Sequence, residues 1–332
     1  MTRRIEVRAP VRLDLAGGWT DVPPFSAERG GAVVNVTIDR YVHVELEGAE
    51  RDIRLEAEDI GQVVEVADRS CLECSGVLAL LQAAVLRCGP ATGLVVRTTC
   101  DTPLGSGLGT SGALGTALIA ACRWFAGHDL NPLAAADLAW RVEVQDCGIP
   151  GGRQDQLAAA LGGCNLLEFH DPEVAVAPIN LPEDVRGAID HRLVLCYVGQ
   201  SRVSGDTIVR VMDAYRRGDR EVVAALDTMK RLAHDMAAAL PRGDLAGIGD
   251  LLTRNWRCQM ALDPAMQTDA MLRLERAVGG AGVLGGKAAG AGAGGCMFFL
   301  AAADPEPVRR AAAAAGATVL PASLAQSGVT RC

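Results

Sequence analysis

The sequence predicts an α+β fold of two domains, and three observations support that prediction. Alternating apolar residues, typical of strands, dominate the first part of the chain, and helical patterns then alternate irregularly with further strands. Residues 204–276 form a long helical region rich in Ala and Leu. Between the two regions, Pro182 and its charged neighbours interrupt the pattern. We therefore expect an N-terminal domain over residues 1–185 and a C-terminal domain over residues 186–332.

The elements of the N-terminal domain follow from the hydrophobic periods. Apolar side chains alternate from Ile5 onwards and the alternation breaks at Ala9-Pro10, so we expect an interrupted first strand. A β-branched segment, 94–99, precedes a glycine-rich loop and an apolar helical stretch. In chain order the expected elements are a strand over 3–16, two strands within 32–47, a charged hairpin over 52–66, a helix over 73–87, a strand over 94–99 and helices over 113–125, 132–147 and 152–161.

The rest of the chain is expected to contain fewer strands and more helices. Strands at 164–169 and 191–198 flank residues 171–189, an acidic segment with proline that we interpret as a loop. The remaining expected elements are helices through 204–276 and then, within 295–331, a strand, a helix over 306–315 and a short strand.

Composition limits the possible functions. Of the 332 residues, 49% are hydrophobic and 22% charged, an ordinary balance for a globular protein. A net charge of −8 argues against nucleic-acid binding, which needs clustered Lys and Arg. Eleven scattered cysteines, and an N-terminal segment without a signal-peptide core, predict reduced thiols in a cytoplasmic enzyme. The most apolar window, 278–303, carries Lys287 and many glycines, so we expect no membrane-spanning helix.

The strongest local signal is the glycine-rich segment 101–113. Three glycines at alternate positions leave its backbone free to curl and to present N–H groups to an anion at the start of the following helix. Thr110 and Ser111 add hydroxyl groups that can cap the helix, touch phosphate or bind a metal. The spacing matches neither a Walker A loop nor a dinucleotide-binding fingerprint. It indicates a phosphate-binding loop, and the alternative is a flexible turn before a capped helix.

Two acidic residues, Glu143 and Asp155, lie on either side of the turn 147–152. Two carboxylates near a triphosphate suit magnesium chemistry, because one can hold the metal while the other handles the proton of the attacking hydroxyl. Asp155 belongs to a polar cluster, 151–156, between that turn and a run of alanines. The alternative is that both carboxylates are solvated helix residues.

Three segments together resemble the GHMP kinase superfamily. They are APVRLDLAGGWTD at 9–21, PLGSGLGTSGA at 103–113 and GKAAGAGAGGC at 286–296, in the family's order and at its usual separations. The resemblance spans nearly the whole chain. It implies a two-domain α+β fold, with an N-terminal domain that is ribosomal S5 domain 2-like, a ferredoxin-like C-terminal domain, and the active site in the cleft between them.

The resemblance also implies roles for individual residues. Asp155 lies where these kinases carry their catalytic base, and Arg12 would lie nearby and favour its ionised form. Ser111 and Glu143 would hold Mg²⁺, and the glycines of the third segment would pack behind the phosphate site. ATP would lie under the loop that contains Pro103, Gly105, Ser106, Gly107, Leu108, Gly109, Thr110 and Ser111.

The acceptor site implied by the resemblance is a sugar site. Asp21 matches a position that holds substrate hydroxyls in the sugar kinases of the family. A distal phosphate on the sugar would need cations, for which Arg153 and Arg202 are candidates and Lys287 is a weaker third; a surface salt bridge is the alternative for the two arginines. The implied substrate-binding residues are Gly18, Trp19, Thr20, Asp21, Gly152, Arg153, Gln154 and Arg202.

Within the superfamily, the chain is similar to the branch that contains fucokinases and heptose 7-phosphate kinases, which phosphorylate the anomeric oxygen. Segments 37–43 and 154–163 are similar to the heptose kinases, whereas Trp19 is fucokinase-like. Gly18-Trp19 replaces the Glu-His pair of galactokinases, so galactose is not expected as the substrate. Ala293 replaces a glycine that is common in the third segment, a change expected to leave the path of the loop intact.

The expected function is ATP- and Mg²⁺-dependent transfer of a phosphoryl group to the anomeric hydroxyl of a sugar, with a heptose 7-phosphate as the favoured substrate. Three alternatives stay open: a fucokinase-like kinase of a free hexose, a non-catalytic ATP- and sugar-binding regulator, and a kinase of a non-sugar such as homoserine or mevalonate. The expected partner is a small-molecule sugar and neither nucleic acid nor membrane. A homodimer is left open.

Overall fold

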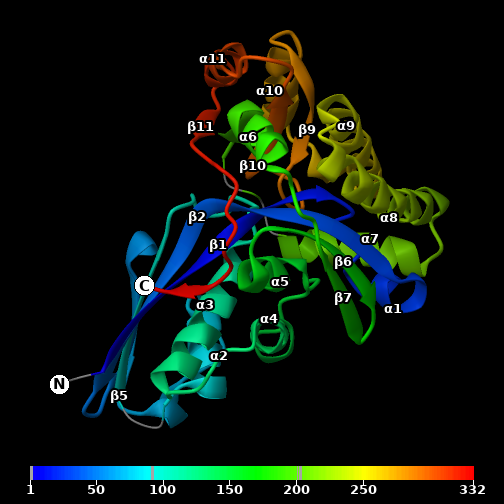
Figure 1. The fold of residues 1–332 in the computed structure, drawn as a ribbon. Coiled ribbons are helices and arrows are strands. Elements are labelled where there is room, and N and C mark those ends of the chain that lie inside the picture. The colour runs from blue at the N-terminus through cyan, green and yellow to red at the C-terminus, as the bar shows by residue number, and fades with distance from the viewer. Residues whose placement is uncertain (1–2, 91–92, 200, 202–203) are drawn as a thin grey trace.

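Two β-sheets organise the molecule (Figure 1). The computed structural model describes residues 3–90, 93–199, 201 and 204–332. The larger sheet has eight strands in the order β12-β1-β2-β5-β3-β4, and β6 pairs with β2 and with β7. Its strands are β1 (Arg4–Ala16), β2 (Gly31–Ala49), β3 (Ile53–Ala57), β4 (Gln62–Val66), β5 (Gly93–Cys100), β6 (Cys164–His170), β7 (Glu173–Pro178) and β12 (Thr330–Arg331).

Helices lie on both sides of the large sheet. In Figure 1 the helices α2 to α5 lie below it, and α8 and α9 lie above it. Side-chain caps start several of these helices: Asn131, Asp219 and Asp244 accept backbone N–H groups at the first turns of α4, α8 and α9. The α-helices as far as residue 262 are α1 (Phe25–Arg29), α2 (Ala79–Cys88), α3 (Thr110–Phe125), α4 (Pro132–Arg141), α5 (Gln154–Leu161), α6 (Glu183–Arg192), α7 (Ser204–Arg216), α8 (Arg220–Ala239) and α9 (Leu245–Leu262).

The small sheet has the order β11-β8-β10-β9, and every neighbouring pair is antiparallel. In chain order its strands and intervening helices follow a β-α-β-β-α-β pattern, which is the ferredoxin-like arrangement. This confirms the α+β fold class and the ferredoxin-like C-terminal part. The remaining elements are β8 (Leu193–Tyr197), α10 (Asp269–Gly279), β9 (Val283–Ala288), β10 (Cys296–Ala301), α11 (Glu306–Ala314) and β11 (Thr318–Leu320).

The end of the chain returns to the first sheet. Val7 of β1 pairs with Arg331 of β12, and the Ala325 N–H donates to the Thr37 carbonyl at 2.8 Å. The division near residue 185 stays a prediction, and the last residues lie against the N-terminal sheet although they follow the C-terminal one.

The predictions were wrong for β1 and β2, for residues 171–189 and for β9. Residues 32–47 belong to one strand, β2, and not to two. β1 is not interrupted at Ala9-Pro10 either, because the pairing of β1 with β2 shifts register between Pro10 and Val11 and both strands continue. Residues 171–189 are not a loop, because they contain β7, which pairs with β6 along its whole length, and α6, which starts directly after Pro182.

The third error concerns β9, which lies in the glycine-rich region where no strand was expected. Glycine weakens an isolated strand, but here it permits close packing. A Cβ on Gly285 would lie 1.8 Å from the Gly249 carbonyl oxygen of α9, so only glycine allows helix and strand to approach this closely.

The two sheets meet through apolar side chains. Leu13 and Leu15 of β1 face Leu252 of α9 and Phe298 of β10 around a cavity of about 30 Å³. A cavity of this size holds roughly one water molecule and no sugar. No helix in the described part of the chain has the length and hydrophobicity needed to cross a bilayer.

Candidate active site

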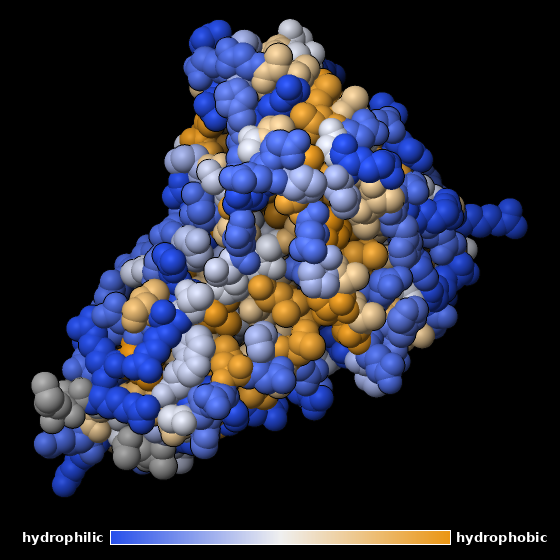
Figure 2. Space-filling model, viewed as in Figure 1, coloured by the Kyte–Doolittle hydropathy of each residue, from blue (hydrophilic) through white to orange (hydrophobic). Residues whose placement is uncertain are grey.

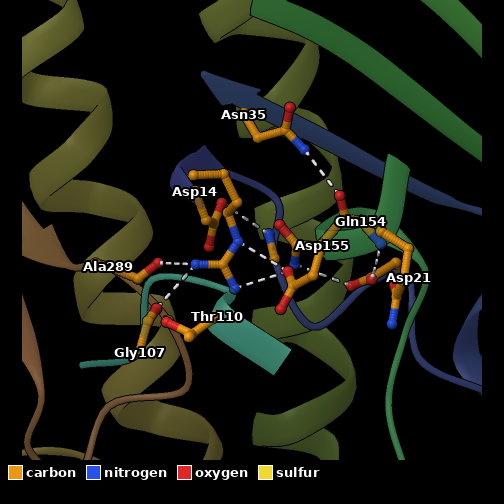
Figure 3. A network of polar contacts seen from close by, with 12 residues as sticks. Asp14, Asp21, Asn35, Gly107, Thr110, Gln154, Asp155 and Ala289 are labelled. Carbon is orange, nitrogen blue, oxygen red and sulfur yellow. Dashed lines mark hydrogen bonds and ion pairs between the residues drawn. The ribbon is translucent and has the colours of Figure 1, made fainter. Parts of the chain in front are cut away.

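Arg12, in the middle of β1, connects several segments that are far apart in the sequence. Its partners Gly107, Asp155 and Ala289 are labelled in Figure 3. Its Nε donates to Asp155 Oδ1 at 2.8 Å and its Nη2 lies 2.7 Å from the same oxygen. Its Nη1 donates to the carbonyl oxygens of Gly107, at 2.8 Å, and Ala289, at 2.9 Å. The sequence-predicted pair of Arg12 and Asp155 is therefore brought together, and the same guanidinium also contacts the segments 103–113 and 286–296.

The glycine-rich loop curls as its composition requires. Gly105, Gly107 and Gly109 have φ angles of 67°, 72° and 76°, in the left-handed region that favours glycine. α3 starts at Thr110 directly after the loop, so the backbone N–H groups of its first turn face this region. A Cβ on Gly109 would lie 3.1 Å from Asp155 Cγ, which puts the predicted phosphate loop against the predicted base.

A second glycine-rich segment packs against this loop, as expected. The Cys296 N–H donates to the Ser106 carbonyl oxygen at 2.7 Å, and a Cβ on Gly290 would lie 2.3 Å from the Gly107 carbonyl oxygen. Ala293 has a φ of 57°, the left-handed conformation in which a glycine would be unstrained, and its N–H donates to Met266. The C-terminal part of the chain thus supports the loop from behind.

Glu143 and Ser111, the two predicted metal ligands, lie in contact with each other. Glu143 lies in a π-helical turn, Val142–Asp146, that continues α4, and it accepts a hydrogen bond from Gln156 Nε2 at 2.5 Å. Burial raises the pKa of Glu143 to about 7, while the Ser111 hydroxyl bound to it lowers that pKa and Asp155 raises it further. A desolvated carboxylate beside an exposed hydroxyl is a set of hard oxygen ligands that a bound Mg²⁺ would stabilise in its ionised form.

Ser111 and Glu143 alone would not fill the coordination of a metal ion. Among the described residues no group of three or more His, Cys, Asp or Glu side chains could hold a metal ion. A magnesium ion bound by Ser111 and Glu143 would therefore take its remaining ligands from phosphate oxygens and water, as this ion commonly does.

The loop after β1 contains another buried carboxylate, that of Asp21. Asp21 accepts hydrogen bonds from the N–H and from Nε2 of Gln154, at 3.1 and 3.3 Å. Burial, and then the charge of Asp155, raise the pKa of Asp21 to about 6. The Thr20 hydroxyl bonds the carbonyl oxygens of Gly17 and Ala32, at 2.7 and 3.0 Å, and so fixes the loop to β2.

Two family models match this chain. Residues 74–163 match the model of the GHMP kinases N terminal domain, and residues 236–318 match that of the GHMP kinases C terminal domain. The chain is 30% identical over 304 residues to a D-glycero-alpha-D-manno-heptose 7-phosphate kinase of Campylobacter jejuni, covering 90% of this chain and 89% of that protein. The chain belongs to the GHMP kinases.

Two further relatives agree with this assignment. This GHMP kinase is 27% identical over 327 residues to a bifunctional fucokinase/GDP-fucose pyrophosphorylase of Arabidopsis thaliana, covering 90% of the chain but 30% of that longer protein. It also matches the crystal structure of a D-glycero-D-manno-heptose 1-phosphate kinase from Bacteriodes thetaiotaomicron with a TM-score of 0.81 and 26% identity, over 100% of this chain and 99% of that one. The resemblance to the heptose kinase and fucokinase branch is confirmed.

The three side chains predicted to bind a distal phosphate have different surroundings or lie outside the described residues in this GHMP kinase. Lys287 was a wrong candidate, because its side chain is fully buried and bound to Asp14, where no substrate phosphate can reach it. Arg153 lies 2.9 Å from Asp171, donates to the Pro172 carbonyl at 2.6 Å and stacks over Trp140 at 4.3 Å, so it makes the salt bridge foreseen as its alternative. Arg202 lies outside the described residues.

Sequence reasoning missed two further side chains that contact the predicted site. Asn255 Oδ1, on α9, accepts the Gly17 N–H at 2.9 Å, and Gln259 Nε2, one turn later, donates to the Gly290 carbonyl at 2.7 Å. Both side chains are fully buried. Their only signal in the sequence was two amides four residues apart, on one face of an otherwise ordinary helix.

Proposed function

We propose that this GHMP kinase transfers the γ-phosphoryl group of Mg-ATP to the anomeric hydroxyl of a heptose 7-phosphate. The observation that carries the proposal is the contact between the first turn of α3 and Asp155, with Arg12 bound to both the carboxylate and the loop. This arrangement gives one place where a phosphate held by backbone N–H groups meets a base that can activate a hydroxyl.

In the proposed reaction, Asp155 accepts the proton of the anomeric hydroxyl while that oxygen forms its bond to the γ-phosphorus. The bond from the γ-phosphorus to the bridging oxygen breaks, and ADP leaves. Arg12 orients Asp155, and the loop N–H groups hold phosphate oxygens. Magnesium held by Ser111 and Glu143 supplies charge neutralisation at the phosphates. Most of the rate enhancement then comes from positioning and electrostatics.

The choice of a heptose 7-phosphate is supported by the relatives. The Campylobacter jejuni protein is named a heptose 7-phosphate kinase, and the chain matches nearly its whole length. A free hexose, as in the fucokinase relative, is the second candidate, because the match to that relative covers the same share of this chain.

We further propose that Arg153 or Arg202 recognises the distal phosphate. We also propose that residues 1–185 and 186–332 are the two domains, and that the enzyme works in the cytoplasm. For Arg153, phosphate would have to displace Asp171.

A coupled ADP-release assay with Mg-ATP tests the proposal. The acceptor panel is a heptose 7-phosphate, L-fucose, D-mannose, galactose, homoserine and mevalonate. Turnover of the heptose 7-phosphate, with the new phosphate on the anomeric oxygen, is the expected result. Turnover of free fucose alone would replace the substrate and remove the distal-phosphate site. ATP binding with no turnover of any acceptor would favour a regulator.

A further inference from the structure

A fully buried ion pair joins the small sheet to β1. Lys287 of β9 has no exposed surface, and Asp14 of β1 is 3% exposed. The ammonium group donates to Asp14 Oδ2 at 2.9 Å, to the Asp14 carbonyl at 2.7 Å and to the Ala288 carbonyl at 2.9 Å. All three of its protons are therefore used within the protein. A pair buried this deeply loses hydration on both charges, so it is weak evidence for stability and calls for another explanation.

The carboxylate of this pair holds the loop between β1 and α1. Asp14 Oδ1 accepts the Gly18 N–H at 3.3 Å. A Cβ on Gly18 would lie 2.2 Å from Asp14 Oδ2, so the loop backbone rests directly on the carboxylate and position 18 must be glycine. The neighbouring Gly17 N–H donates to Asn255. The Gly17 N–H thus binds a side chain of α9, and the next N–H, that of Gly18, binds the carboxylate that Lys287 holds in place.

The same stretch of the small sheet also orients Arg12. The Ala289 carbonyl, two residues after Lys287, accepts from Arg12 Nη1 at 2.9 Å. Arg12 and Asp14 are themselves two residues apart on β1. The end of β9 therefore sets two relationships at once: the direction of the Arg12 guanidinium toward Asp155, and the position of the loop that carries Asp21.

We propose that Lys287 is a positioning residue for the acceptor: through Asp14 it holds the 17–21 loop at the distance from Arg12 and Asp155 that transfer requires. The inference rests on the proposed function, in which this loop binds the sugar. Lys287 contacts no substrate, because its side chain has no exposed surface. Its effect reaches the acceptor only through the backbone of Gly18.

The test uses the full chain and two variants, K287M and the double variant D14N/K287M. In K287M the carboxylate of Asp14 loses its partner, so we expect a lower Tm, a sugar KM raised roughly tenfold or more, and an ATP KM within about twofold of wild type. Hydrogen exchange at the Gly18 amide should accelerate. The double variant removes both charges, so its Tm should recover while the sugar KM stays raised.

Each outcome decides between positioning and a merely structural role. If the sugar KM of the double variant returns to the wild-type value together with its Tm, the proposal is overturned. The matched control is E275A, which removes the partner of Trp256 Nε1 within the same domain, at 2.7 Å, and should lower Tm without moving the sugar KM. An equal rise of the sugar KM in E275A would also overturn the proposal. If the wild type phosphorylates no sugar, the proposed function fails, and the exchange of the Gly18 amide in K287M still decides the inference: unchanged exchange overturns it.

Discussion

Two of the three donor nitrogens of Arg12, Nε and Nη2, lie against the same oxygen of Asp155, at 2.8 and 2.7 Å. Within the described part of the chain no hydrogen bond reaches the other oxygen, Oδ2. The Asp155 side chain is 26% exposed, whereas that of Arg12 is 7% exposed. The carboxylate is therefore oriented from its buried side and keeps one oxygen available to a hydroxyl that approaches from solvent.

The first prediction concerns this free oxygen. D155N keeps the shape and the hydrogen-bond acceptor toward Arg12 but cannot accept the acceptor's proton, so we expect kcat to fall by about 10²–10⁴ with Tm within a few degrees of wild type. Steady-state kinetics and thermal unfolding measure the two quantities. The matched control is D137N, which removes the exposed carboxylate partner of Arg141 and should leave kcat unchanged. Near-wild-type turnover by D155N would exclude the role of base.

The second prediction separates Arg12 from Asp155. Arg12 also donates to the Gly107 carbonyl, so it supports the phosphate loop as well as Asp155. A lysine has one nitrogen and cannot make these bonds together. We therefore expect R12K to lower kcat and also to raise the ATP KM, by roughly tenfold each, whereas D155N changes kcat alone. An R12K enzyme with an unchanged ATP KM would show that the loop does not depend on the guanidinium.

The third prediction follows from the pKa of Glu143, which burial raises from 4.5 to about 7. Between these two values the native state without metal binds a proton that the unfolded state releases. The free energy of unfolding should therefore fall as the pH rises from about 5 to 7. E143Q removes this contribution, so without metal it should be more stable than wild type at pH 8, by on the order of 3 kcal/mol, and its stability should depend less on pH.

The same variant should lose function. Glutamine has no charge for Mg²⁺, so we expect E143Q to lose most of its activity and also the rise in Tm that Mg-ATP gives the wild type. For the wild type, binding of Mg²⁺ competes with protonation, so Mg-ATP stabilisation should weaken as the pH falls below about 7. Differential scanning fluorimetry across pH, with and without Mg-ATP, measures both effects. An E143Q protein that Mg-ATP stabilises like wild type would exclude Glu143 as a ligand.

Much of the fold could be predicted from the sequence, and the errors have physical causes. The alternating pattern around Val7, the β-branched segment 94–99 and the long helical periods in 204–276 identified several of the elements, because each of these buries apolar side chains. Residues 171–189 were misread because acidic residues and proline are typical of loops. There, however, Pro182 precedes a helix whose first turn is acidic, which is itself a helix-start signal. β9 was missed because its glycines serve a close contact that only tertiary structure creates.

Part of the candidate site could also be predicted from the sequence. Arg12 and Asp155 are 143 residues apart and no local pattern relates them, so their pairing was predicted from the family resemblance alone. The resemblance could not show what holds these residues in place, because Asn255 and Gln259 lie on a helix outside the three segments that carry it. Lys287 illustrates the limit: it was a weaker third candidate for binding a distal phosphate, and only the structure shows that it is buried and paired with Asp14.

The last prediction tests the support behind the phosphate loop. A Cβ on Gly290 would lie 2.3 Å from the Gly107 carbonyl oxygen, the same oxygen that accepts from Arg12. G290A must therefore push the loop away, at a cost of roughly 1–3 kcal/mol for a forced backbone shift. If that cost appears in nucleotide binding, the ATP KM rises by about 10- to 100-fold. The sugar KM should change less, because the 17–21 loop is held by Asp14 and Asn255.

The control for this variant is G280A. Gly280 directly follows α10 with a φ of −78° and has open space where a Cβ would lie, so alanine fits there without strain. Isothermal titration with a non-hydrolysable ATP analogue would report binding separately from turnover. Weak nucleotide binding by G290A beside normal binding by G280A is the expected pair of results. Equal binding by the two variants would mean that the phosphates do not rest on the loop at Gly107, and the nucleotide would have to be placed elsewhere in this GHMP kinase.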